Sequence, residues 1–365
     1  MKSLRLILVL LTCLGLALSA CAQANPTQPP AQATPAVTAT PANTATPEGY
    51  PASLNTIPTQ PENYPAPGAT ATSETYPAPG TAAAGAITLT DGLNRKVTLT
   101  APAQKIVSLA PSNTEILFYL GAGAQVIGRD EFSDFPAEVK SLPSVGGSMG
   151  KYNLEAIANL KPDLVLLASI NTAEQVKALT DLNLNVFYLA NPTDINGMYA
   201  NLQLVAQLVG KGDQTETLIQ SLKGRVDAVT AKLAKVTTRP RVYYELDFSN
   251  PTKPYTAGPG SFVDSLLLQA GGENIAAGLK GQYAEISVEE IVAKNPQVIL
   301  LGDTAYSNPP VTPENAAQRS GWDALDAVKN KQVFAFDDNL VSRPTARLVD
   351  GLEAIAKLIH PEAFK

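Results

Sequence analysis

Residues 153–167 read NLEAIANLKPDLVLL, and residues 287–301 read SVEEIVAKNPQVILL in the same register. Each segment predicts a short helix that a proline ends, followed by an apolar strand. In each segment a glutamate, Glu155 or Glu289, lies seven residues before that proline. One unit of this kind in each half of the chain indicates two similar α/β lobes.

Further apolar runs around the repeat continue the alternation of strand and helix, which is the pattern of parallel βαβ units. Before them, residues 87–100 alternate apolar and polar side chains around a turn and predict a β-hairpin. The other strands are expected at residues 105–110, 163–168 and 185–190, and again at 241–247, 297–303 and 332–337. Helices of the second lobe are expected near residues 261–270, 288–295 and 345–359.

One long helix is expected between the lobes, over residues 213–236, which contain no proline. At the usual rise per residue it would be about 36 Å long. Asp213 and Glu216 predict a capping-box-like start, and Pro240 prevents continuation of the helix. Apolar residues recur along it at spacings of three and four, at Leu218, Leu222, Val226, Val229 and Leu233. As the only crossing between the lobes, this helix should resist large bending motions.

The predicted fold class is therefore α/β, with two Rossmann-like lobes built on parallel sheets and joined by one long helix. The expected boundaries are residues 87–212 for the N-terminal lobe, 213–238 for the linking helix and 239–365 for the C-terminal lobe.

The first 86 residues have a different composition. Lys2 and Arg5 precede an apolar run over residues 6–18, which is too short to span a bilayer and fits a secretory signal. The run ends in LSAC at residues 18–21, which resembles the lipobox of bacterial lipoproteins and implies a signal peptide over residues 1–20 with a lipid on Cys21. The alternative is an ordinary signal peptide that leaves Cys21 as a free thiol.

Residues 21–86 are rich in Pro, Thr and Ala, and they predict a disordered tether because they offer little apolar surface to bury. The many threonines leave open a glycosylated stalk. Together with the lipobox, the tether predicts an extracytoplasmic protein of the cell envelope that a lipid anchors to the membrane.

Charge and composition exclude several classes of function. The formal net charge of −6 gives no electrostatic footprint for nucleic acid. The only cysteines, Cys13 and Cys21, precede the folded part, and His360 is the only histidine. Most hydrolase triads and zinc sites are excluded in consequence, and we expect no catalytic residues, no bound metal of the protein's own and no cofactor.

Four segments carry a resemblance to a known family, namely residues 106–115 (IVSLAPSNTE), 132–136 (FSDFP), 160–165 (LKPDLV) and 271–274 (GGEN). Jointly they resemble the helix-linked class of periplasmic binding proteins, class III, which serve ABC importers for cobalamin, ferric siderophores and haem. The resemblance extends over nearly the whole folded part. It implies a monomer that captures a metal chelate or a corrinoid and delivers it to the transmembrane subunits of a permease.

In that family one glutamate on a helix of each lobe meets arginines of the permease. The matching positions are Glu155 and Glu289, with Glu290 a less favoured choice for the second. A purely structural role is the alternative. Asn153 and Ser287 are N-cap residue types, so both glutamates fall in a first helical turn, where the helix dipole favours negative charge.

The resemblance also implies a ligand cleft between the lobes, at the carboxyl ends of the strands. The candidate ligand-binding residues lie in loops that follow the predicted strands. Aromatic faces there suit a planar corrin, porphyrin or catecholate, although each ring could equally be a packing residue. Arg343 could pair with a carboxylate or phosphate of the ligand, or be solvated. The candidates are Pro111, Ser112, Asn113, Phe132, Tyr152, Asn171, Phe248, Tyr255 and Arg343.

The ligand itself stays open between a cobalamin-type corrinoid and a ferric siderophore. Tryptophans often line the cleft of cobalamin binders in this family, whereas the only one here, Trp322, falls in a predicted peripheral helix. Haem ligation by imidazole is disfavoured by the position of His360, although a tyrosinate ligand such as Tyr152 remains open. Two alternative functions remain, a sensory or adhesive surface lipoprotein on the same fold and an exported α/β enzyme.

Overall fold

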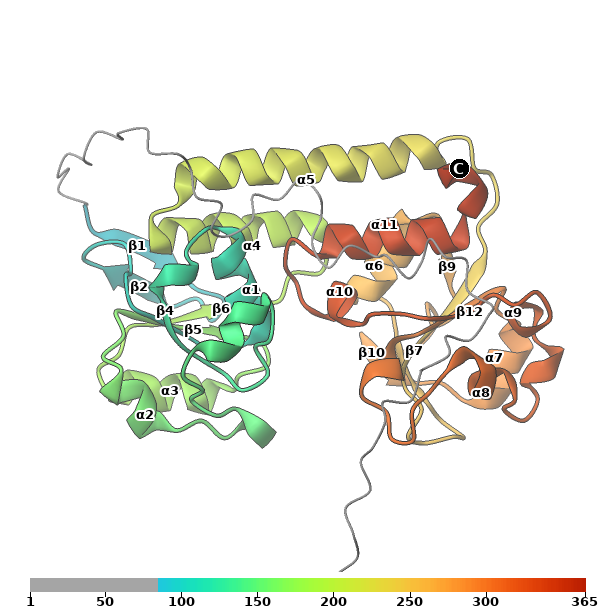
Figure 1. Cartoon of the computed structure of the whole chain (residues 1–365), viewed down its shortest axis with the longest axis horizontal. Coiled ribbons are helices and arrows are strands. Elements are labelled where there is room, and N and C mark those ends of the chain that lie inside the picture. The colour runs from blue at the N-terminus through green and yellow to red at the C-terminus, as the bar shows by residue number, and fades with distance from the viewer. Residues whose placement is uncertain (1–84) are drawn as a thin grey trace, which may run out of the picture. The chain divides into compact units, whose positions relative to one another are not determined.

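The computed structural model describes residues 85–365, all of which belong to one compact unit. The predicted signal peptide, Cys21 and nearly all of the predicted tether lie outside the described residues. Within the described part, two α/β lobes are connected by a single long helix, as the sequence predicts (Figure 1).

The N-terminal lobe opens with the predicted hairpin, β1 (Ile87–Thr90) paired with β2 (Lys96–Leu99). A parallel sheet of order β4-β3-β5-β6 follows. Its strands are β3 (Ile106–Ser108), β4 (Val126–Arg129), β5 (Leu164–Ala168) and β6 (Val186–Leu189). Its helices are α1 (Pro111–Tyr119), α2 (Leu154–Asn159), α3 (Ala173–Asp181) and α4 (Ile195–Val209). Of these strands, β4 is the one that the sequence analysis did not anticipate.

Both faces of this sheet are buried, which explains its continuous apolar strands. Alternate residues of β5 pack into different clusters, with Leu164 and Leu166 on one face and Val165 and Leu167 on the other. All four side chains are fully buried.

The C-terminal lobe contains a mixed sheet of order β10-β8-β7-β11-β12, with β9 beside β7. The predicted strands β7 (Arg241–Asp247), β11 (Val298–Leu301) and β12 (Val333–Ala335) are parallel, as is the short β9 (Glu273–Asn274). Antiparallel β8 (Tyr255–Ala257) and β10 (Tyr283–Glu285) extend the sheet beyond β7 and were not anticipated. The helices are α6 (Phe262–Gln269), α7 (Val288–Lys294), α8 (Pro313–Ala317), α9 (Asp326–Lys329), α10 (Asn339–Ser342) and α11 (Leu348–Ile359).

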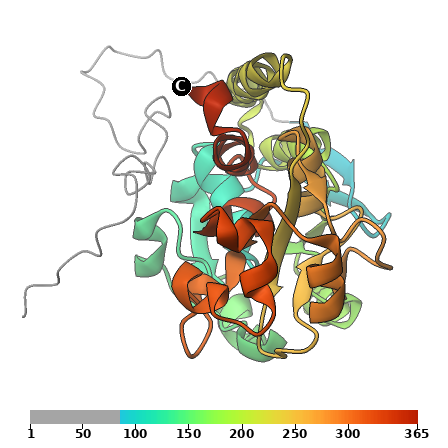
Figure 2. The same ribbon diagram turned by 90° about the vertical axis from the view of Figure 1, so that its right-hand side faces the viewer.

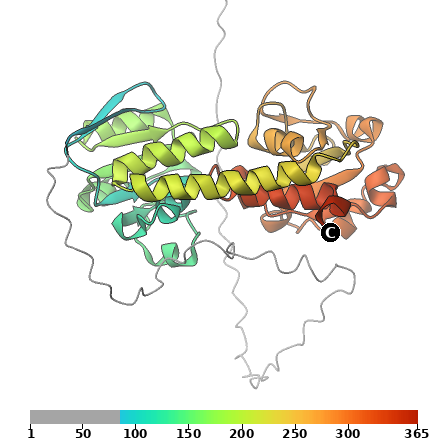
Figure 3. The same ribbon diagram turned by 90° about the horizontal axis from the view of Figure 1, so that it is seen from above.

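The linking helix α5 (Gly212–Leu233) contains 22 residues and runs across both lobes (Figure 3). Its start differs from the prediction, because Lys211 is the N-cap, without a side-chain cap hydrogen bond, and Asp213 lies in the first turn. On the C-terminal lobe, Arg225 of α5 binds Asp350 and Glu353 of α11 at 2.6 and 2.9 Å. Figure 2 looks nearly along these two helices and shows them side by side.

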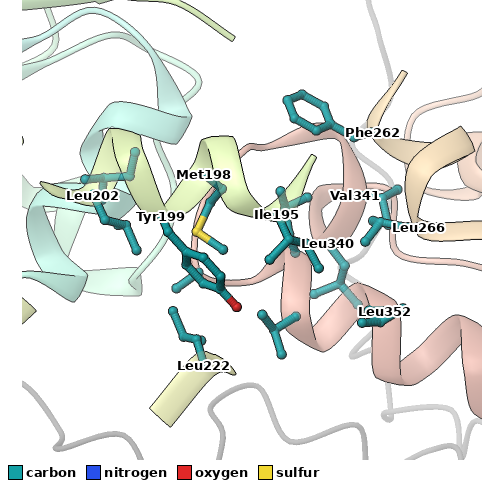
Figure 4. Close-up of a cluster of buried hydrophobic side chains, with 14 of the residues drawn as sticks. Ile195, Met198, Tyr199, Leu202, Leu222, Phe262, Leu266, Leu340, Val341 and Leu352 are labelled. Atoms are coloured by element: carbon teal, nitrogen blue, oxygen red, sulfur yellow. The ribbon is translucent and has the colours of Figure 1, made fainter. Parts of the chain in front are cut away.

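One apolar cluster passes from the N-terminal lobe through α5 into the C-terminal lobe. Figure 4 shows the part where the lobes meet, with Ile195 of α4 close to Leu340 of α10 and Leu222 of α5 below them. Since these side chains are buried, the lobes share a core at this point. A large change in their relative orientation would therefore expose apolar surface.

Candidate functional site

Tyr152 and Asn171 lie together at the carboxyl edge of the N-terminal sheet. The Tyr152 hydroxyl donates to the Leu109 carbonyl at 2.9 Å, and Asn171 Nδ2 donates to the Tyr152 hydroxyl oxygen at 2.8 Å. Burial, the largest cause, raises the pKa of Tyr152 above its usual value, and the negative charge of Asp130 raises it further. The phenol is thus held protonated, which disfavours it as a tyrosinate ligand for iron.

The first turn of α1 is more deeply buried than a set of ligand contacts would suggest. Asn113 is fully buried, and neither its Nδ2 nor its Oδ1 has a hydrogen-bond partner. Ser112 is also buried, whereas Pro111 is half-buried. A buried amide without partners is unfavourable, so Asn113 retains unused donor and acceptor capacity beside the strand edge.

Two of the predicted aromatic residues are exposed, one on each lobe. Phe132, in the loop after β4, is 54% exposed, and Tyr255, at the start of β8, is 45% exposed. Tyr255 pairs in the sheet with Asp247 and Glu285, which places it at the carboxyl end of β7. These two rings can therefore offer a face to a ligand.

Two further exposed tyrosines were missed by the sequence analysis. Tyr283 on β10 is 50% exposed, and Tyr306 is 58% exposed in the segment that follows β11. A signal for Tyr306 was present, since it closely follows the predicted strand 297–303. Tyr283 carried no such signal, because β10 is defined by its pairing with β8.

Phe248 packs against an arginine that forms a buried ion pair. The Arg319 guanidinium lies 3.4 Å from the centre of the Phe248 ring and binds both carboxylate oxygens of Glu245, at 2.6 and 2.9 Å. Burial raises the pKa of Glu245 to about 7, against the lowering effect of Arg319. The indole of Trp322 meets Phe248 edge-on at 6.0 Å. Trp322 lies in the short 3-10 helix Trp322–Ala324, and its side chain is completely buried, so it offers no ring face to a ligand.

Arg343 is already engaged between the lobes. Its Nη1 atom lies 2.8 Å from Glu115 of α1 and 2.7 Å from Asp134. Thr345 donates to the other oxygen of Glu115 at 3.0 Å, and Arg347 approaches the carboxylate at 3.4 Å. Burial, the largest cause, raises the pKa of Glu115, whereas the two arginines lower it. A ligand anion at Arg343 would have to share the guanidinium with these carboxylates.

The two repeated glutamates occupy equivalent local positions. Asn153 caps α2 by accepting from the Ala156 amide, and Ser287 caps α7 by accepting from the Glu290 amide. Glu155 and Glu289 lie in the first turns of these helices, and both are exposed. In Figure 1, α2 and α7 lie on the side of their lobes away from α5. Glu290, the less favoured choice, is half-buried and lies 3.6 Å from Lys294.

Within residues 85–365, no group of three or more His, Cys, Asp and Glu side chains is arranged to hold a metal ion.

Sequence comparison relates the chain to known proteins. The sequence pattern of a family described as periplasmic binding protein matches residues 106–340. The uncharacterized ABC transporter substrate-binding lipoprotein YvrC of Bacillus subtilis (strain 168) is 30% identical over 282 residues, which cover 76% of this chain and 87% of YvrC.

Two solved structures are similar in fold and in sequence. A possible iron-binding (periplasmic solute-binding) protein of Staphylococcus epidermidis superposes with a TM-score of 0.62 at 29% identity, over 71% of this chain and 99% of that one. The periplasmic vitamin B12 binding protein BtuF of Vibrio cholerae gives a TM-score of 0.61 at 26% identity, over 72% of this chain and 99% of BtuF.

Proposed function

The chain belongs to the periplasmic binding protein family, and on that basis we propose that it captures a cobalamin-type corrinoid or a ferric siderophore outside the cytoplasm and delivers it to an ABC permease. Members of this family act as binding proteins of ABC transporters. In this proposal the protein is a monomer that binds its ligand without catalysing a reaction, and both lobes contribute to one ligand site.

The observation that carries the ligand class is the presence of an exposed aromatic ring on each lobe, Phe132 in the loop after β4 and Tyr255 at the start of β8. Aromatic faces bury large area against planar or apolar ligands at little cost in side-chain entropy. The relatives support the same range of ligands, because BtuF is described as a vitamin B12 binder and the staphylococcal protein as possibly iron-binding.

Titration with cyanocobalamin and with ferrioxamine B tests this proposal, using quenching of the single tryptophan, Trp322, as the signal. We expect saturable submicromolar binding of at least one chelate. Phe132→Ala and Tyr255→Ala should each weaken it about tenfold or more, the factor that 1.4 kcal/mol represents. Leu268→Ala, which removes an equally exposed apolar side chain from α6, is the matched control and should leave affinity unchanged. Absence of saturable binding to either chelate would refute the proposal.

Docking to the permease is assigned to Glu155 and Glu289. Their support is the repeated geometry, with one exposed glutamate in the first turn of a capped helix on each lobe. Two like charges on separate lobes can bind two cationic partners and fix the orientation of the protein on the permease.

Charge reversal tests this assignment. The double variant Glu155→Lys, Glu289→Lys should abolish stimulation of the importer's ATPase while ligand affinity stays at the wild-type value. The control reverses two exposed carboxylates elsewhere, Asp213→Lys on α5 and Glu273→Lys on β9, and should retain stimulation. Full stimulation by the first variant would exclude these glutamates as the docking residues.

Membrane attachment is assigned to a lipid on Cys21. None of the helices between residues 85 and 365 combines the length and the apolar character that a membrane crossing needs. The lipobox-like sequence at residues 18–21 supports attachment at the cysteine, and the YvrC relative is described as a lipoprotein. In detergent phase partitioning of whole cells, the wild type should enter the detergent phase and Cys21→Ser the aqueous phase. Equal partitioning of the two would contradict the assignment.

A further inference from the structure

Three carboxylates gather at the carboxyl edge of the C-terminal sheet. Asp247 ends β7, Asp303 follows β11 and Asp338 follows β12. Because these three strands are parallel and adjacent, their carboxyl ends meet at one edge. The sequence analysis assigned none of these carboxylates to a ligand.

Tyr306 lies among these carboxylates with its ring exposed. Its hydroxyl donates to the Leu246 carbonyl at 2.5 Å, which fixes the ring over the end of β7. Burial of the hydroxyl, followed by the charges of Asp338, Asp303 and Asp247, raises the pKa of Tyr306 well above its usual value. Tyr283, the other exposed ring, also responds to the charge of Asp338, after the larger effect of burial.

Asp303 has unused acceptor capacity at this edge. The residue is 1% exposed, and its Oδ1 atom has no hydrogen-bond partner, whereas Oδ2 accepts from the Phe248 amide at 3.2 Å. A buried carboxylate oxygen without a donor is unfavourable, so a donor from a bound molecule would be stabilised there. Asp338 differs, because its Oδ1 accepts from the Tyr244 hydroxyl at 2.7 Å.

The neighbouring arginines have their charges engaged by other carboxylates, including Arg343, whose charge acts on Asp338 and which binds Glu115 and Asp134. Arg319 binds Glu245, as described above, and lies behind the Phe248 ring. Arg347 reaches Asp337 at 3.3 Å and Glu115 at 3.4 Å. An anionic group that arrives at this edge would therefore meet carboxylates and would compete with existing ion pairs for a guanidinium. Like charges brought together at an interface are strongly unfavourable.

We propose that this surface, the tyrosine–carboxylate patch (Asp247, Tyr283, Asp303, Tyr306 and Asp338), binds N–H donor groups of the ligand, carboxamide or ammonium, and rejects chelates that present a carboxylate or a catecholate there. The proposal rests on the function proposed above and states which chemical groups of the ligand face the C-terminal lobe. The two tyrosine rings contact the apolar body of the ligand, and the carboxylates select the groups at its edge.

Matched ligands that differ only at the edge test this selection. The first set is cyanocobalamin and its monocarboxylic acids, in which one peripheral propionamide is hydrolysed. The second is ferrioxamine B, which carries an ammonium group, and its N-succinyl derivative, which carries a carboxylate instead. In either set that binds, we expect at least one carboxylate derivative to bind about tenfold or more weakly than its parent, a difference of about 1.4 kcal/mol. Raised salt should reduce the difference.

Two variants connect the selection to the patch. Asp303→Asn should reduce the difference in affinity between the parent chelate and its carboxylate derivative, because it removes one negative charge. The asparagine keeps an acceptor for the Phe248 amide. Asp323→Asn removes an exposed carboxylate elsewhere in the same lobe and should leave the difference as it is in the wild type. A difference unaffected by Asp303→Asn in the folded protein would contradict the assignment to this patch.

The comparison in wild-type protein needs no variant to fold. Equal or tighter binding of all carboxylate derivatives would overturn the selection and leave the proposed transport function standing. Failure of every chelate in both sets to bind would overturn the proposed ligand class and the selection with it.

Discussion

Arg319 connects a buried acid to an aromatic ring at the candidate site. Its guanidinium binds Glu245, which is fully buried, and lies against the face of Phe248. Because a planar guanidinium can satisfy a carboxylate at its edge and stack on a ring with its face, lysine could not replace it here. The position of Phe248 thus depends on Arg319, which is held in place by the buried carboxylate of Glu245.

Arg319→Met should destabilise the protein strongly at pH 8 and less at pH 5.5. Removing one partner of a buried ion pair costs about 3–5 kcal/mol, because the other charge is left unpaired. Burial already raises the pKa of Glu245 to about 7, and loss of Arg319, which lowers that pKa, will raise it further. The folded variant then keeps a proton that the unfolded chain releases near pH 4.5, so stability falls as pH rises through this window. Urea denaturation at the two pH values measures the difference.

A second variant tests the cause of this pH dependence. Glu245→Gln introduced together with Arg319→Met removes the buried charge, so it should recover part of the stability at pH 8 and abolish the added pH dependence. A loss of stability that is the same at both pH values would contradict an origin in Glu245.

Individual residues were predictable where their role depends on local sequence. The N-caps Asn153 and Ser287 identified the first turns that carry Glu155 and Glu289, and both caps form in the structure. The ion pair between Glu115 and Arg343 joins residues 228 positions apart. A pairing of this kind depends on how the two lobes meet, and no local pattern contains that information.

At the scale of elements, a long helix was likewise predictable from its own sequence, whereas short strands that depend on a pairing partner were not. The apolar spacing along α5 predicted its buried stripe, since Leu222 and Val229 are buried and Leu218 is half-buried. The short strands β4, β8 and β10 were missed because a run of three or four residues acquires its identity from the strand it pairs with. Mispredicting the start of α5 has a related cause, because the chain enters it directly from Gly210 in a left-handed conformation.

Gly224→Ala should stabilise α5 by about 0.5–1 kcal/mol. Gly224 lies in the interior of the helix on its exposed side, and a Cβ atom there would meet no other atom within 4 Å. Alanine therefore gains helix propensity and restricts the unfolded chain without a steric penalty. The midpoint of urea denaturation should increase at an unchanged slope.

Gly302→Ala is the opposite control for this prediction. A Cβ atom at Gly302 would lie 2.6 Å from the Tyr244 hydroxyl oxygen, so this substitution should destabilise the C-terminal lobe. If the urea midpoint of Gly224→Ala is equal to or lower than that of the wild type, the stability of α5 does not contribute to the stability of the folded unit as predicted.

At the scale of the whole folded unit, three features hold the lobes together. They are the helix α5, the apolar cluster that continues from Ile195 to Leu340, and the ion-pair group of Glu115, Arg343 and Arg347. The sequence predicted the long helix and the apolar faces that form the cluster, but it did not predict the ion-pair group. Because all three would be disturbed by a rotation of one lobe against the other, we expect the ligand to bind with little change in lobe orientation.

Glu115→Ala tests how much the ion-pair group contributes. It leaves Arg343 and Arg347 half-buried with only Asp134 and Asp337 as partners, so the loss in stability should be near the lower end of the range for a broken buried pair, about 3 kcal/mol.

Lys177→Ala is the control, because it removes an exposed ion pair with Asp181 of similar length and should cost about 0.5 kcal/mol or less. Urea denaturation at pH 7, followed by Trp322 fluorescence for the C-terminal lobe and by far-ultraviolet circular dichroism for both lobes, measures each loss. The wild-type transitions should coincide, because the lobes share a core and unfold together. Equal losses for the two variants would show that the lobes are held by α5 and the apolar cluster without help from Glu115.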